Sequence, residues 1–101
     1  MEFIEEIFVG ESVKDLSTII YSLKRGIPVF NLYCICLFSR ENNPFEILTS
    51  RELFLPRNKE KNYLIAGIAT GKREATDLFL YMVEHAAAAG RDVAKPEELI
   101  K

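Results

Sequence analysis

The stretch from Tyr63 to Ala75, Tyr-Leu-Ile-Ala-Gly-Ile-Ala-Thr-Gly-Lys-Arg-Glu-Ala, decides how this chain folds. An apolar, strand-like run leads through Thr70 and Gly71 directly into a helical pattern. Backbone N–H groups, the helix dipole and the side chains of Lys72 and Arg73 converge at such a junction. No other part of the sequence concentrates so many polar groups at one point.

The elements on either side of this junction are a strand over residues 63–69 and a helix over residues 72–89. The helix carries apolar side chains at the spacing of one helical face and ends at Gly90. The strand contains the small residues Ala66, Gly67 and Ala69, which allow a helix to approach the sheet closely.

Farther upstream, residues 29–40 form the clearest strand pattern in the chain. One face would carry Phe30, Leu32, Cys34, Cys36 and Phe38, and the other Val29, Tyr33, Ile35 and Leu37. Since both faces are apolar, this strand should be central and covered on both sides. Residues 40–44 have the composition of a turn, and residues 45–49 return as a second strand.

Three further segments complete the expected order of elements. Residues 12–25 predict a helix that begins in a capping box-like pair, Ser12 with Asp15, and ends at Gly26. Thr49 with Glu52 would cap a short helical turn over residues 50–54, and residues 56–62 would form a solvated loop. For residues 2–9 the spacing fits a helix or a strand, and we favour a strand or an extended arm.

These patterns predict an α+β fold, an antiparallel sheet of three to four strands with two helices packed mainly on one face. Residues 1–90 would form the single domain that a chain of 101 residues can build. Residues 91–101 would form a loosely held C-terminal tail. A 49% share of hydrophobic residues is ample for one core.

The charge is close to balanced overall but unevenly placed. The formal net charge is −2 and the isoelectric point is near 5.4, which argues against a general binder of nucleic acid. Residues 1–15 carry five carboxylates against one lysine, whereas residues 51–73 carry six cationic side chains against two carboxylates. The two regions could attract each other within one fold or across a dimer, which we favour over a binding role for the basic region.

The junction at Gly71 is the candidate for an anion site, formed by Thr70, Gly71, Lys72 and Arg73 with the loop cations Arg57, Lys59 and Lys61. It departs from a phosphate-binding loop, because three residues instead of four separate Gly67 from Gly71 and Arg73 replaces the Ser or Thr that holds Mg²⁺. We favour the interpretation in which Glu74 and Asp77 balance the two cations over a weaker contact with an anionic ligand.

The order helix–strand–strand–strand–helix, with Gly71-Lys72-Arg73-Glu74-Ala75 opening the last helix, resembles the double-stranded RNA-binding domain. This resemblance covers residues 12–89 and implies that the basic residues would contact phosphates of A-form RNA. With an acidic isoelectric point, we expect nucleic acid to be an unfavoured partner.

The remaining reactive side chains predict packing rather than chemistry. Cys34 and Cys36 lie two apart on one strand face, and His85 is the only histidine, which makes no metal-ligand pattern. The sequence contains no recognisable set of catalytic residues, so we predict neither a metal nor a cofactor and lean against an enzyme. With no signal peptide pattern and no apolar run of spanning length, we expect a cytoplasmic protein without a membrane segment.

The leading hypothesis is a small non-enzymatic interaction module that forms a homodimer through its sheet. Two helices on one side of a small sheet would leave the other side bare, and a large exposed apolar face is unusual in a soluble monomer. The expected interface consists of Val29, Tyr33, Ile35, Leu37 and Tyr63. The alternative is that residues 1–9 or the C-terminal tail cover this face within one chain.

Overall fold

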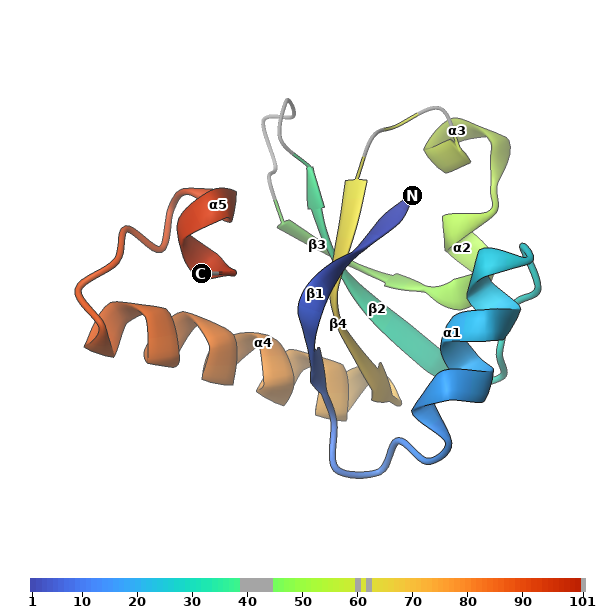
Figure 1. The fold of residues 1–101 in the computed structure, drawn as a ribbon, viewed down its shortest axis with the longest axis horizontal. Coiled ribbons are helices and arrows are strands. Elements are labelled where there is room, and N and C mark those ends of the chain that lie inside the picture. The colour runs from blue at the N-terminus through green and yellow to red at the C-terminus, as the bar shows by residue number, and fades with distance from the viewer. Residues whose placement is uncertain (39–44, 60, 62, 101) are drawn as a thin grey trace.

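A computed structural model describes residues 1–38, 45–59, 61 and 63–100 (Figure 1). The elements follow one another as β1 (Glu2–Val9), α1 (Leu16–Lys24), β2 (Leu32–Phe38), β3 (Phe45–Thr49), α2 (Ser50–Leu53), α3 (Pro56–Lys59), β4 (Tyr63–Thr70), α4 (Lys72–Ala88) and α5 (Pro96–Leu99). The predicted α+β class is confirmed. The expected turn at residues 40–44 lies outside the described residues.

The four strands form one mixed sheet in the order β1-β4-β2-β3 (Figure 1). Strand β2 pairs antiparallel with β3 on one side and with β4 on the other. The sequence suggested a sheet that is antiparallel throughout. This expectation is wrong for one pair, because strand β1 pairs parallel with β4. The favoured strand over residues 2–9 is confirmed, and the long connection between β1 and β4 allows its parallel direction.

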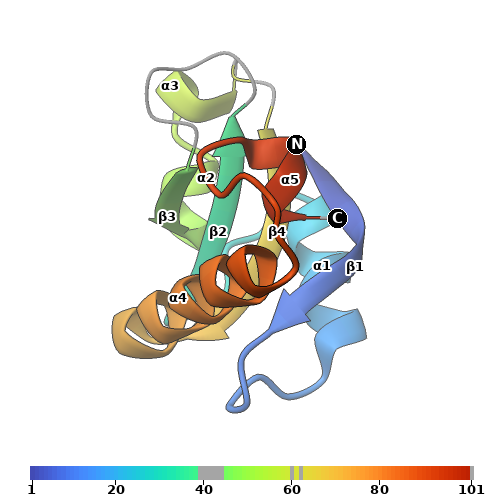
Figure 2. The ribbon, with the colours of Figure 1, turned by 90° about the vertical axis from the view of Figure 1, so that its left-hand side faces the viewer.

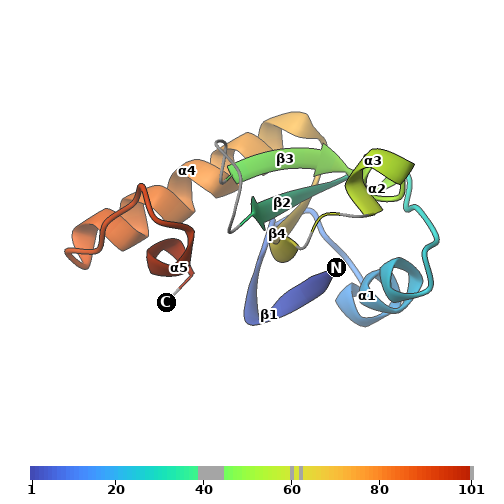
Figure 3. The same ribbon diagram turned by 90° about the horizontal axis from the view of Figure 1, so that it is seen from above.

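The two main helices pack on opposite faces of the sheet, whereas the sequence suggested that both lie mainly on one face (Figure 3). On one face Leu32, Cys34 and Cys36 of β2 pack in a cluster with Leu23 of α1. On the other face Ile35 and Leu37 of β2 pack with residues of α4, Met82 and Ala86. The physical reason is that β2 is apolar on both sides, so each side has to be covered, as the pattern of residues 29–40 predicted; the structure covers each side with a helix.

The C-terminal residues, expected as a loosely held tail, turn back after α4 so that α5 lies beside it (Figure 2). Leu99 of α5 is 1% exposed and belongs to the same apolar cluster as Met82 and Leu37. Ile4 and Phe8 of β1 pack against this cluster as well. The two ends of the chain thus help to cover the α4 side of the sheet. Such covering within one chain was the expected alternative to a homodimer.

A β-bulge at Ala66 shifts the pairing register of β4, which lies between β1 and β2 in the sheet. Between β2 and β4 the register shifts by one residue, so that Ile35 pairs with Gly67 but Cys36 pairs with Ile65. The residue between them, Ala66, is the extra residue of a β-bulge. It brings Ile65 and Ile68, three residues apart, into the α1-side cluster, while the small residues between them lie under α4.

Two further segments differ from the expectation in a way that can be traced to named contacts. Helix α1 begins at Leu16 instead of Ser12, because Asp15 adopts a left-handed conformation and caps the helix through Thr18. The segment expected as a solvated loop contains the helical turn α3, and Asn58 is buried there with its amide donating to the Glu52 carbonyl at 2.7 Å. The capping box of Thr49 with Glu52 is confirmed.

Replacing Gly67 with Ala should destabilise the fold by about 1–3 kcal/mol, because the added methyl group would crowd the Ile35 side chain of β2 and the Leu78 side chain of α4. A Cβ atom at this position would lie 3.1 Å from Ile35 Cδ1 and 3.3 Å from Leu78 Cδ2. Urea unfolding of G67A, of I35V and of the double variant measures the effect. We expect the double variant to lose less than the two single losses added together, since Ile35→Val removes the nearest atom. Additive losses would show that this close approach is not the cause.

Candidate functional site

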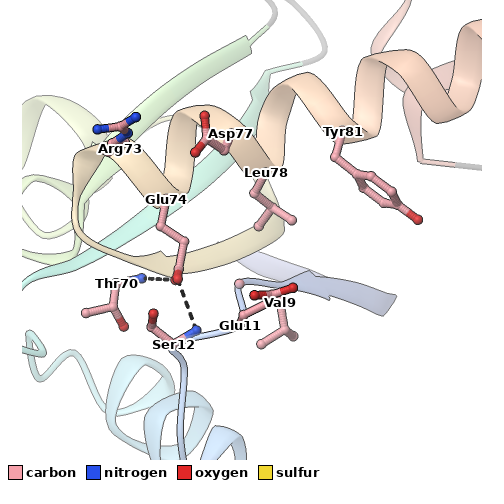
Figure 4. A pocket seen from close by; sticks show the side chains of 10 residues that line it. Val9, Glu11, Ser12, Thr70, Arg73, Glu74, Asp77, Leu78 and Tyr81 are labelled. Carbon is pink, nitrogen blue, oxygen red and sulfur yellow. Dashed lines mark hydrogen bonds between the residues drawn. The ribbon is translucent and has the colours of Figure 1, made fainter.

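Glu74 ties the junction between β4 and α4 to the segment that follows β1 (Figure 4). Its Oε1 accepts a hydrogen bond from the Thr70 backbone N–H at 2.8 Å, and its Oε2 accepts one from the Ser12 N–H at 3.0 Å. Gly10 leaves space for this carboxylate, because a Cβ there would collide with Glu74 Oε1. Ser12 is thus held by a residue 62 positions away, which helps to explain why α1 does not begin there.

A hollow of about 760 Å³ opens beside this junction, between the end of β1 and the first turns of α4 (Figure 4). Its charged side chains are three carboxylates, on Glu11, Glu74 and Asp77, and one guanidinium, on Arg73. Apolar walls come mainly from Leu78 and the ring of Tyr81. The hollow is therefore predominantly acidic, although the sequence marked this junction as a place for an anion.

The residues predicted to bind an anion at the junction are Thr70, Gly71, Lys72 and Arg73. Gly71 is the N-cap of α4 with φ +84°, and Lys72 and Arg73 are exposed in the first turn. The Thr70 N–H, however, already donates to Glu74, so an anion approaching it would meet a carboxylate of the chain itself. Since like charges repel, this contact disfavours the predicted anion site, which stays a prediction.

The other predicted cations do not join this site. Arg57 lies exposed in α3 and Lys61 lies just before β4, whereas Gly71 follows the last residue of that strand (Figure 1). The eight residues of β4 separate the two groups by about 23 Å along the strand. Lys59 is the last residue of α3 and lies between Arg57 and Lys61 in the sequence, on the same side of β4.

The chemistry available at the junction favours a structural role for Glu74. Hydrogen bonds, first from Ser12 and then from the Thr70 N–H, lower the pKa of Glu74 below its ordinary value of 4.5. A carboxyl with a lowered pKa stays ionised and is a weaker general base. His85 does not reach toward it; the imidazole is exposed and stacks on Tyr81 with 5.9 Å between ring centroids.

Cys34 and Cys36 are packed in the core, as the sequence predicted. Both are buried, and the Cys36 thiol donates to the Cys34 carbonyl at 3.7 Å. Burial raises the pKa of Cys34 to about 12 and that of Cys36 well above its ordinary value, so both remain thiols at neutral pH. Within residues 1–38, 45–59, 61 and 63–100, no group of three or more His, Cys, Asp or Glu side chains is placed to hold a metal ion.

The five residues expected at an interface are not all accessible in one chain. Ile35 and Leu37 are buried on the side of α4, and Tyr63 is buried on the side of α1 and α2. Val29 and Tyr33 are only partly buried and lie where β2 begins. The accessible part of the expected interface is therefore the end of the sheet, not one of its faces.

Phe30 dominates this end of the sheet, with 97% of its surface exposed. It lies in the turn before β2, although the sequence pattern placed it within that strand, on the same face as Leu32 and Cys34. Beside it is a hollow of about 560 Å³, lined by Pro28, Val29, Phe30, Asn31, Leu32, Tyr33, Thr49, Ser50 and Arg51. We refer to Phe30 and the residues lining this hollow as the Phe30 surface.

Hydrogen bonds on both sides of Phe30 hold its backbone in place. The buried Ser50 hydroxyl accepts from the Val29 N–H at 2.8 Å and donates to the Val29 carbonyl at 2.7 Å. On the other side, the Asn31 carbonyl accepts from the Gly71 N–H at 2.9 Å. Asn31 has φ +57°, which breaks the strand alternation, and asparagine is one of the few residues that tolerate this conformation. Pro28 and Asn31 were the signals that could have placed Phe30 in a turn.

No protein-family model, curated protein or solved structure matches this chain. The similarity to the double-stranded RNA-binding domain therefore rests on the order of the elements. Across the described ranges, no helix combines the length and apolar character needed to cross a membrane.

Glu74→Gln should lower the stability at pH 7 by about 1 kcal/mol or less, because the two N–H donors lose a charged acceptor near solvent. The folded-state pKa of Glu74 lies below 4.5, so its contribution is fully present above that value and is lost as the pH falls through the folded pKa. Urea unfolding between pH 7 and pH 3 should show the two proteins converging in acid. Glu84→Gln, an exposed change on the same helix, is the matched control. A difference that persists unchanged at pH 3 would contradict this role.

Ser50→Ala should destabilise the protein by about 1–3 kcal/mol, because Val29 loses both hydrogen bonds to a buried hydroxyl. Ser17→Ala, on the exposed side of α1, should change stability by about 0.5 kcal/mol or less. Thermal and urea unfolding measure both variants. Equal stability of the two variants would mean that Ser50 does not hold the turn.

Proposed function

We propose that this protein is a small non-enzymatic interaction module that self-associates at the end of its sheet, through the Phe30 surface. The observation that carries the proposal is the 97% exposure of Phe30 on a turn whose backbone is fixed by Ser50 and Gly71. Burying a phenylalanine side chain contributes about 1.5–3 kcal/mol, and aromatic anchors of this kind dominate many interfaces. A two-fold dimer would gain this contribution twice.

The faces of the sheet offer less to a partner than the sequence suggested. Each face of β2 is covered by a helix of the same chain, so the apolar area that motivated a face-to-face dimer is already buried. What remains of the expected interface is Val29 and Tyr33, which line the hollow beside Phe30. The proposal therefore moves the interface from a face of the sheet to its end.

The two edges of the sheet also favour the Phe30 surface. On one edge, β1 carries exposed glutamates at positions 2, 5 and 6, and its pairing with β4 is interrupted between Phe3 and Phe8. Charges and irregular pairing are features that hinder strand addition. The other edge strand, β3, has five residues, one of them the exposed Glu46, and a charge on an edge strand also hinders strand addition.

Phe30→Ala should weaken dimerisation at least about tenfold, because it removes the anchor while leaving the fold intact. Light scattering coupled to size exclusion, at protein concentrations from 5 to about 200 µM, measures the association. Leu80→Ala, which removes a half-exposed side chain from α4, is the matched control and should leave the association unchanged.

Wild-type protein that stays monomeric over this whole range would refute the proposal. It would be refuted equally if Phe30→Ala and the wild type associated with the same affinity. The unfolding free energy of F30A should change by about 0.5 kcal/mol or less, because the side chain has almost no contacts to lose within its own chain.

A further inference from the structure

We infer that residues 91–100, which we call the strap, open as a unit while the sheet, α1 and α4 stay folded. The closed strap then hides an apolar surface of α4, and its opening uncovers that surface to solvent or to a competing segment. The strap takes no part in the Phe30 surface, so this inference goes beyond the proposed function and does not depend on it.

The strap lies along a part of α4 that projects beyond the sheet. The C-terminal half of α4 extends past the strands, and the strap folds back beside it (Figures 1 and 3). Four apolar side chains of this half belong to the same cluster as Leu99 of the strap: Phe79, Met82, Val83 and Ala86. The strap therefore helps to shield the apolar face of α4 where that helix leaves the sheet.

A few side chains anchor the strap to this cluster. Leu99 is 1% exposed, and Val93 and Ile100 are partly buried against the same cluster. Four other strap residues are exposed: Asp92, Ala94, Lys95 and Glu97. A segment anchored chiefly through Leu99 buries little apolar area for each residue whose backbone has to be ordered.

The hydrogen bonds of the strap are local. The Glu98 and Leu99 N–H groups donate to the Lys95 carbonyl at 3.1 and 3.3 Å. Gly90, with φ +75°, lies between α4 and the strap in a conformation that glycine adopts readily. Since these bonds pair groups of the strap with one another, the strap can leave the cluster without breaking a strand pairing.

Local opening is a general property of folded proteins, and it occurs in units that have few buried contacts and low local stability. The strap meets this description, whereas β2 is covered on both faces and belongs to the most protected part of the fold. The apolar face of α4 under the strap is accessible only while the strap is open. The strap is therefore a cover, built into the chain, that controls access to this face.

Thiol labelling of the full chain measures the opening. Ala86→Cys places a thiol on the face of α4 that carries the strap, and Ala75→Cys places one at an equally buried position near the start of the same helix. The native Cys34 and Cys36, buried on the opposite side of the sheet, report global unfolding in both proteins. Each rate of reaction with Ellman's reagent is divided by the rate in the urea-unfolded protein. A86C should react at least about tenfold faster than A75C, because the strap opens more often than the whole fold.

Two further measurements connect this reactivity with the strap. Leu99→Ala should raise the labelling rate of A86C at least about tenfold, because it removes the main anchor of the strap. Between 0 and about 1 M urea, the rate of A86C should rise less steeply than that of A75C, because strap opening exposes less surface than unfolding. Leu99→Cys, which places the thiol on the strap itself, is the second probe if Ala86→Cys prevents folding.

Three results would overturn the inference. The first is that A86C and A75C react at the same rate, and the second is that they show the same dependence on urea. Either result would mean that the strap opens only when the whole protein unfolds. The third is fast labelling of A86C that Leu99→Ala leaves unchanged, which would assign the exposure to fraying of α4 alone.

Discussion

The double shielding of β2 is the constraint on which the rest of this structure depends. Its side chains alternate between two apolar clusters, so a helix is required on each side of the sheet. Helix α1 covers one side, and α4 together with the C-terminal Leu99 covers the other. The chain of 101 residues covers both faces of β2 with its own helices. The surfaces open to a partner are therefore the ends and the edges of the sheet.

A single carboxylate organises the other polar part of the molecule. Glu74 accepts hydrogen bonds from two N–H groups that lie 58 residues apart in the chain, at Ser12 and Thr70. It joins the segment after β1 to the start of α4 and, with Glu11 and Asp77, gives the neighbouring hollow its acidic character. The same contact places a carboxylate at the Thr70 N–H, one of the donors that the predicted anion site would use.

The proposed function follows from Phe30, the most exposed large apolar side chain among the residues that the structure describes. Phe30 is exposed because its backbone is held by Ser50 from α2 and by the link between Asn31 and Gly71. These contacts come from residues 21 and 40 positions further along the chain than Val29 and Asn31. A fixed, solvent-exposed ring beside a recess is characteristic of an interface anchor and contributes nothing to the core of its own chain.

The sequence by itself determined the α+β class, the central two-sided strand, the capping box at Thr49 and the helix after Gly71, because these depend on local patterns and on hydrophobic periodicity. Only the tertiary structure decided that β1 runs parallel to β4, that the helices divide between the two faces, and that Ala66 shifts the register of the central strand. It also decided that Phe30 points outward and that Glu74 accepts hydrogen bonds from the Thr70 and Ser12 N–H groups. Those features arise from contacts between residues far apart in the chain, and no local periodicity contains that information.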